Sequence, residues 1–272
     1  YEVIDSSQDP EVIERKKLIK SFIERLTAGE DLESVRADFR ANFEGVSSAE
    51  IMDAEEELLA SGMDKAEVRK LCDVHSSLFH GMTENENEKT SYDDIPFISY
   101  FARENQKIKE ILDKNDGDFE NLRGILAKHY KKKGDLIYPI LKAKYNKPGP
   151  SDVMWAVDIE IVNNIKKALK LQNEDLLEKS IERAKEMTYK EENILYPLMK
   201  DTLTSQDLDI LYEDLADYDH DLVAYNQEET ASKALADDNY IHFAKGKMRI
   251  DQLEAMLDTC LLYTSPSPRD AT

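Results

Sequence analysis

Six ionisable side chains in the middle of the chain have the types and spacing that could bind a metal ion. They are Glu104, His129, Asp158, Glu160, Glu191 and Glu192. In helical bundles, carboxylates and imidazoles that project from facing helices bind iron, manganese or zinc. The alternative is that these charges lie on the solvated faces of a very acidic protein.

A second pair of candidates lies nearer the N-terminus. Cys72 and His75 are three residues apart on an expected helix, so they share a face and could bind a metal or form a redox pair. Their apolar neighbours Leu71, Leu78 and Phe79 favour the plainer interpretation, a core cysteine beside a hydrogen-bonded histidine.

Several other chemistries lack sequence support. The run Lys131-Lys132-Lys133 is a lone basic stretch, which by itself indicates a solvated helix face. We find no P-loop, no Gly-x-Gly-x-x-Gly motif and no Gly-x-Ser-x-Gly motif. Nucleotide-dependent catalysis and serine-hydrolase chemistry are therefore not indicated, and nothing in the sequence establishes an enzyme.

Composition predicts that helices position these residues. The 272 residues include 9 glycines and 8 prolines, too few for a turn-rich β fold, so we expect an all-α protein. The net charge of −21 argues against binding to nucleic acid and to anionic membranes. The two cysteines are typical of a reducing cytoplasm, which is the predicted location. The oligomeric state stays open.

The pattern of caps, breaks and apolar periodicity divides the chain into five parts. We predict a small helical module over 10–82, an acidic linker over 83–93, an up-down four-helix bundle over 94–203, a helical extension over 204–259 and a tail over 260–272 that resembles translated adapter sequence. The bundle helices are expected at about 95–115, 118–145, 151–171 and 174–200.

An internal repeat supports the bundle. Residues 129–139 and 187–197 align without gaps at an offset of 58, and both end in Tyr-Pro after two aliphatic residues. This predicts two related helical hairpins about a pseudo-twofold axis, with a kink or a stop at each proline. It also puts His129 and Glu191 in nearly the same layer.

Several segments together resemble a known domain order. The run from Leu18 to Phe79, with Leu26-Thr-Ala-Gly-Glu-Asp31 and Leu71-Cys-Asp-Val-His75, resembles the domain of unknown function numbered 438. The run from Phe101 to Leu203 resembles the hemerythrin-like HHE cation-binding domain, through Glu104-Asn105, His129-Tyr130 to Pro139, Val153-Met-Trp155 and Lys190-Glu-Glu-Asn-Ile-Leu-Tyr-Pro197. Residues 246–256 resemble the lead-in to a PAS domain that is absent from the chain.

This resemblance implies a non-haem iron site, with zinc or manganese as alternatives, built from His129, Asp158, Glu160, Glu191 and Glu192. It also implies sensing of iron, oxygen, nitric oxide or redox state, with a protein partner or a PAS or output domain downstream. The chain departs from the pattern, since residues 94–100 contain no histidine and position 187 is methionine. Lys133 could place an ammonium near Glu191. We therefore expect a signalling fragment with a weakened, mononuclear or lost metal site; the alternatives are an iron storage or repair protein and a metal-free interaction scaffold.

Overall fold

The computed structural model describes residues 10–47, 50–51, 54, 78–83, 91–114, 117–149, 153–226, 240–243 and 246–249, and all structural statements concern these residues. The chain forms two compact units, Tyr1–Tyr225 and Asn226–Thr272. The first unit therefore extends beyond residue 203, where the sequence suggests that the bundle ends. None of the described helices is long and apolar enough to cross a membrane.

The N-terminal module begins with two capped helices, α1 (Pro10–Thr27) and α2 (Leu32–Asn42). Between them Gly29 has a φ of +87°, a left-handed conformation that suits glycine and ends α1. The Asp31 carboxylate accepts a hydrogen bond from the Ser34 amide and caps α2. Ser47 and Glu50 form a capping box, because the Ser47 amide donates to Glu50 and the Glu50 amide donates to the Ser47 hydroxyl.

A cluster of phenylalanines forms the core of this module. The Phe39 ring contacts the rings of Phe22, Phe43 and Phe79 at centroid distances of 4.7–5.6 Å. Ile13 of α1 lies outside this core and is 38 % exposed. Most of the predicted third and fourth helices, including Cys72 and His75, lies outside the described residues.

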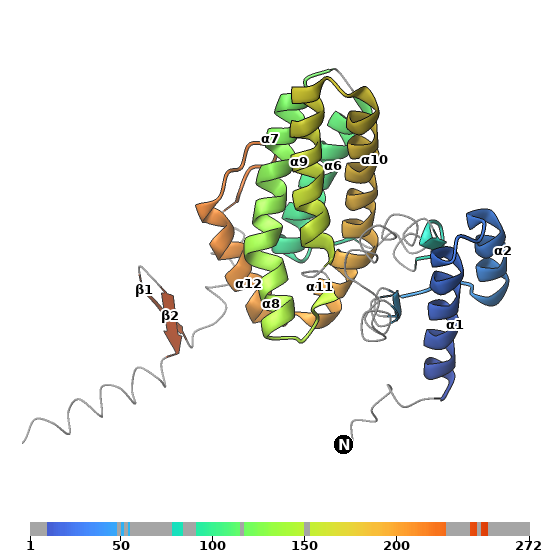
Figure 1. The fold of residues 1–272 in the computed structure, drawn as a ribbon. Helices are drawn as coiled ribbons and strands as arrows, with labels where there is room; N and C mark the ends of the chain where they lie inside the picture. The colour runs from blue at the N-terminus through green and yellow to red at the C-terminus, as the bar shows by residue number, and fades with distance from the viewer. Residues whose placement is uncertain are drawn as a thin grey trace, which may run out of the picture. The chain divides into compact units, whose positions relative to one another are not determined.

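Four helical rods form the bundle, as Figure 1 shows. They are built on α6 (Pro96–Lys114), α7 (Phe119–Lys132), α9 (Trp155–Leu171) and α10 (Glu174–Lys190). Short α8 (Tyr138–Ala143) prolongs the α7 rod, and α11 (Tyr196–Thr202) prolongs the α10 rod. The all-α prediction is confirmed for this unit.

The two repeat-related rods widen where the sequence predicts a kink or a stop. Each changes from α-helix to a five-residue π-helix, at Lys133–Ile137 and at Glu191–Leu195. The Tyr138 amide donates to the Lys133 carbonyl, and the Tyr196 amide donates to the Glu191 carbonyl, five residues back in both cases. A proline follows each segment and lacks the amide that a regular helix would use there, so the wider turn lets the rod continue.

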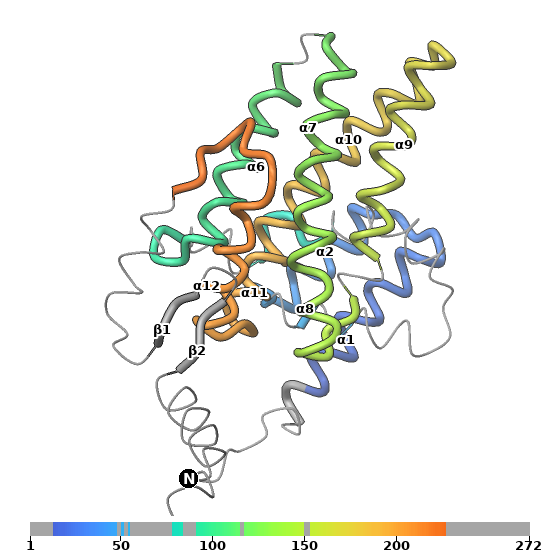
Figure 2. The backbone as a smooth tube through the Cα atoms, turned by 90° about the vertical axis from the view of Figure 1, so that its left-hand side faces the viewer, coloured from blue at the N-terminus to red at the C-terminus, as the bar shows by residue number. Residues whose placement is uncertain are grey.

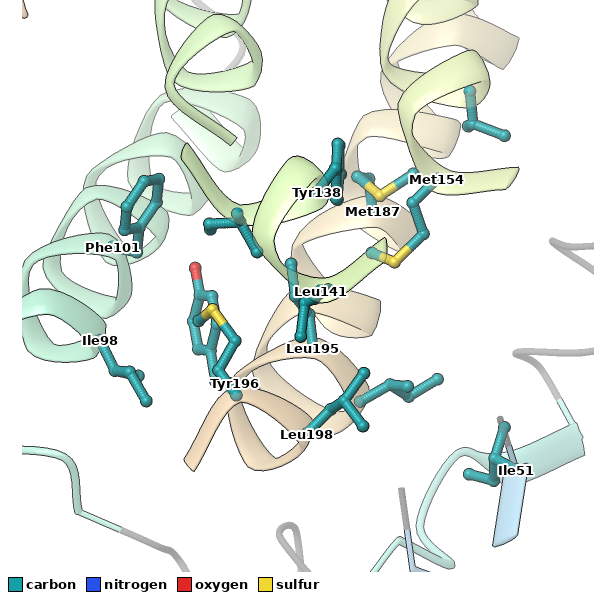
Figure 3. Close-up of a cluster of buried hydrophobic side chains, with 14 of the residues drawn as sticks. Ile51, Ile98, Phe101, Tyr138, Leu141, Met154, Met187, Leu195, Tyr196 and Leu198 are labelled. Carbon is teal, nitrogen blue, oxygen red and sulfur yellow. The ribbon is translucent and has the colours of Figure 1, made fainter. Parts of the chain in front are cut away.

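Apolar side chains fill the space between the rods around these π-helices. Figure 3 shows Leu141 next to Leu195 and Tyr196, with Phe101 and Ile98 on the neighbouring helix. All five of these side chains are fully buried. This packing fixes the helical faces that carry the charged residues.

The chain after the bundle departs from the helical extension expected over 204–259. The predicted start at Thr204 is confirmed, since its hydroxyl caps α12 (Ser205–Asp214), and a 3₁₀ turn follows at Leu215–Asp217. In the second unit, however, β1 (Tyr240–Phe243) and β2 (Gly246–Arg249) form an antiparallel hairpin. Tyr240, Ile241 and Phe243 are strong β-formers, which explains why a helix is not formed there.

Candidate functional site

Four of the sequence-predicted ligands lie together inside the bundle. Glu104 comes from α6, His129 from α7, Asp158 from α9 and Glu191 from the π-helix that follows α10. Each is at most 2 % exposed. One acidic or imidazole group from every rod thus reaches the same buried region, as a bundle metal site would require.

His129 is held between two carboxylates. Its Nδ1 lies 2.9 Å from Glu104 Oε2, and its Nε2 lies 2.9 Å from Glu191 Oε2. An ionised carboxylate only accepts hydrogen bonds, so both ring nitrogens must donate and the ring must be a charged imidazolium. Burial alone would lower the pKa of His129, but Glu191 and Glu104 outweigh it and raise this pKa.

Lys133 lies between the other pair of carboxylates. Its fully buried ammonium donates to Asp158 Oδ1 at 3.0 Å and to Glu191 Oε1. This ammonium also lies 4.4 Å from the centroid of the Tyr130 ring, at a distance suited to a cation–π contact. The interpretation of this lysine as part of a solvated helix face is therefore wrong, whereas the expectation that it places an ammonium near Glu191 is confirmed.

Lys132 neutralises the remaining carboxylate. It is 2 % exposed, and its ammonium donates to Glu104 Oε1, to the Tyr100 hydroxyl at 3.0 Å and to the Asp219 carbonyl at 3.0 Å. Of the basic run, only Lys131 is exposed, as the sequence predicts.

Buried tyrosines complete the hydrogen bonding of the carboxylates. Tyr138 donates to Asp158 Oδ2 at 2.8 Å, Tyr100 donates to Glu104 Oε1 at 3.1 Å, and Tyr196 donates to Glu191 Oε2 at 3.4 Å. Each anion therefore has a cation and a phenol as donors. Donors of this kind are what make a buried carboxylate tolerable.

Asp158 and Glu191 share Lys133 and titrate differently. Burial would raise the pKa of Glu191, but Lys133 and His129 overcome it and lower this pKa to about 2. For Asp158, burial and the nearby Glu191 charge exceed the effects of Lys133 and Tyr138, and its pKa rises to about 6. Like charges in one site push pKa values apart in this way.

The buried charges cancel without a metal ion. Three cations (His129, Lys132 and Lys133) face three carboxylates (Glu104, Asp158 and Glu191). A metal ligand must be a neutral imidazole, whereas both nitrogens of His129 are used as donors. The ammonium of Lys133 also occupies the position between two carboxylates where a cation would bind. This arrangement does not fit a metal, and within the described ranges no three or more histidine, cysteine or carboxylate side chains are placed so that they could hold a metal ion.

Two predicted ligands point elsewhere. Glu160 forms an ion pair with Arg183 at 2.9 Å, and its side chain is 42 % exposed. Glu192 pairs with Lys109 at 2.7 Å on the side of the bundle, where burial raises its pKa. Neither contacts His129. Cys72 and His75 lie in the part of the chain that the structure does not describe.

The sequence contained a signal for the residues that were missed. His129, Lys132 and Lys133 are at positions i, i+3 and i+4, which share one face of a helix. Leu122 and Leu126 precede them on that face and are buried. If the apolar stripe of Leu122 and Leu126 is extended by one helical turn, Lys132 and Lys133 fall on the buried face of the helix.

The fold and the site define an all-α protein whose bundle holds an ion-paired core. Residues 19–85 match a family of unknown function designated DUF438, which confirms the N-terminal part of the resemblance. Comparisons with curated proteins and with solved structures gave no match.

Proposed function

We propose that this chain is a non-enzymatic signalling module whose bundle transmits between the N-terminal helices and the C-terminal unit, and whose core needs no metal. One observation carries the proposal, the Lys133 ammonium held between Asp158 and Glu191. It supplies the positive charge that a metal would supply in a hemerythrin-like bundle, so we favour the metal-free scaffold over iron storage or repair.

Contacts at the N-terminal end of the bundle support a transmitting role. His80, within the residues matched by the DUF438 family, lies 3.2 Å from Glu186 of α10. Its ring also packs on Tyr189, with centroids 3.8 Å apart. A change in the contact of His80 with Glu186 or with Tyr189 thus acts on α10, the helix that leads to Glu191. A protein partner or a downstream PAS or output domain in the cytoplasm remains part of this proposal.

Metal reconstitution tests the proposal. The full chain is incubated anaerobically with Fe²⁺, Zn²⁺ or Mn²⁺, and bound metal and Tm are measured. We expect no stoichiometric metal and no change in Tm. Uptake of about one ion per chain, lost on replacing His129 and Glu191 with alanine, would establish the metal-binding alternative instead.

A Lys133→Met variant is the comparison in which we expect metal binding to appear. It removes the ammonium and leaves three carboxylates around the site, so we expect it to gain affinity for divalent metal. A ligand at a hundred times its Kd adds about 2.7 kcal/mol of stability, which is a readily measured rise in Tm. Lys109→Met, on the surface pair with Glu192, should gain none.

A further inference from the structure

Residues 215–225, here called the strap, link the bundle to the C-terminal unit. Figure 2 shows the segment that follows α12, in orange, running back beside α6. Within the strap only Leu215 and Val223 are buried, and five residues are exposed (Ala216, Asp217, Asp219, Asp221 and Ala224). Leu215 and Val223 belong to the apolar core, and Tyr218, Leu222 and Tyr225 pack against it. Because the residues between these contacts are exposed, the strap opens more easily than the buried helices.

Between its apolar contacts, the strap passes over a cavity. A space of about 500 Å³ separates it from α7, with three lysines of α7 on one side and Asp217, Tyr218 and Asp219 of the strap on the other. Polar contacts add to the apolar contacts that hold the strap. At the outside, Tyr218 donates to Asp135 at 3.2 Å, and Lys128 pairs with Asp219 at 3.3 Å.

The two innermost contacts reach the ionic core. Lys132 donates to the Asp219 carbonyl at 3.0 Å, and the Tyr100 hydroxyl lies 2.9 Å from His220 Nδ1. Both Lys132 and Tyr100 also donate to the same oxygen of Glu104, Oε1. Each inner anchor of the strap is thus one hydrogen bond away from Glu104.

The far end of the strap is closed by aromatic rings. His220 stacks on Tyr225 with centroids 5.2 Å apart, and Tyr225 packs on Tyr212 of α12 at 5.1 Å. Tyr225 is the last residue of the first compact unit. A movement of the inner anchors is therefore transmitted to Tyr225, the residue after which the second unit begins.

We infer that the strap is a latch that couples the hydrogen bonds of Glu104 in the ionic core to the C-terminal unit. This inference rests on the proposed signalling function. When Glu104 holds Lys132 and Tyr100, these two groups keep the strap docked. A change in the core that breaks the contact between Lys132 and Glu104 leaves this ammonium without its anion, so it turns toward the cavity that it lines and gives up the Asp219 carbonyl. Coupling of this kind is reciprocal, so undocking the strap loosens the core contacts of Glu104.

Hydrogen exchange of the full chain, read by mass spectrometry, tests the latch with three variants. Glu104→Gln changes the core without altering a strap residue, His220→Phe removes one anchor without altering a charged residue of the core, and Lys109→Met is a control outside both. A hydrogen bond to a charged group changes an equilibrium roughly 10- to 150-fold, and a neutral one roughly 2- to 12-fold. We therefore expect strap peptides to exchange about tenfold faster or more in Glu104→Gln and about twofold faster or more in His220→Phe. The control should leave them unchanged.

Two results would overturn the latch. One is strap exchange that is unaltered in His220→Phe, which does not depend on the stability of the Glu104 variant. The other is Glu104→Gln accelerating the strap and all bundle peptides by the same factor, which would mean only a loss of global stability. Metal reconstitution is a separate measurement, so failure of the latch and failure of the metal-free proposal are distinguishable.

Discussion

Replacing Lys133 with methionine should destabilise the bundle strongly, and a second substitution should recover part of the loss. Lys133 and Glu191 are fully buried, and Asp158 is 1 % exposed. In Lys133→Met, two cations face three carboxylates, so one buried negative charge is uncompensated. Breaking a buried ion pair on one side costs about 3–5 kcal/mol, a large part of a total stability of about 5–15 kcal/mol. Glu191→Gln leaves the opposite imbalance, three cations and two carboxylates.

The double variant Lys133→Met/Glu191→Gln has two cations and two carboxylates and is neutral again. We therefore expect its loss of stability to be smaller than the sum of the single losses by about 2 kcal/mol or more. Urea unfolding gives these values, and Trp155, the sole tryptophan, reports on the bundle because it lies beside Gly134 and Tyr138.

The neighbouring surface pair provides a matched control. Lys109 and Glu192 have the same side-chain types, with 44 % and 28 % exposure. Their Met and Gln variants should couple by no more than about 1 kcal/mol, as exposed pairs do. If the Lys133–Glu191 coupling were no larger than this, the buried network would not hold the bundle together and the reasoning would be wrong.

Three further predictions concern other parts of the chain. Burial would raise the pKa of Asp207, but hydrogen bonds from Lys144 and its neighbours lower this pKa to about 2, below the ordinary 3.8. The ionised carboxylate should therefore stabilise the fold by about 2 kcal/mol at neutral pH. That contribution should vanish as the pH falls from about 4 to 2. Acid unfolding of Asp207→Asn, which should lack this dependence, checks the sign. A methyl group at Gly134 would lie 3.1 Å from Trp155 Nε1; since that ring is 43 % exposed and can shift, Gly134→Ala should change stability by less than about 1 kcal/mol while altering tryptophan fluorescence. Phe39→Ala should cost about 3–5 kcal/mol in the N-terminal module, measured by thermal unfolding of that region, and a near-neutral result would contradict the packing of its ring cluster.

The sequence predicted the fold well where local signals and burial agree. Caps at Asp31, Asn173 and Thr204 mark helix starts that the structure shows. The π-helices at 133–137 and 191–195 were not predicted, because the apolar periodicity of a helix does not reveal one extra residue in a turn. The repeated Tyr-Pro indicated only a kink or a stop at these positions. The hairpin at 240–249 was missed because two short strands leave a weak pattern.

The site was predicted by residue type but not by protonation or by partner. His129, Asp158 and Glu191 do come together, as the bundle implied. Whether such a group binds a metal depends on what else enters the same space. In the metal-free proposal Lys133 answers that question, and its charge suggested solvent although its helical position put it in the core. A buried charge is recognisable only through its partners, which lie on other helices and far away in the sequence.

The internal repeat has a consequence for assembly. Lys133 and Glu191 occupy equivalent positions of the two repeats, at the first residue of each π-helix, and they pair with each other. Two copies of the first hairpin facing each other would bring lysine against lysine, and two copies of the second would bring glutamate against glutamate. Either like-charge pair would be buried and strongly unfavourable. The first hairpin therefore packs favourably against the second and unfavourably against a copy of itself. This one pair of residues thus disfavours the association of two identical hairpins.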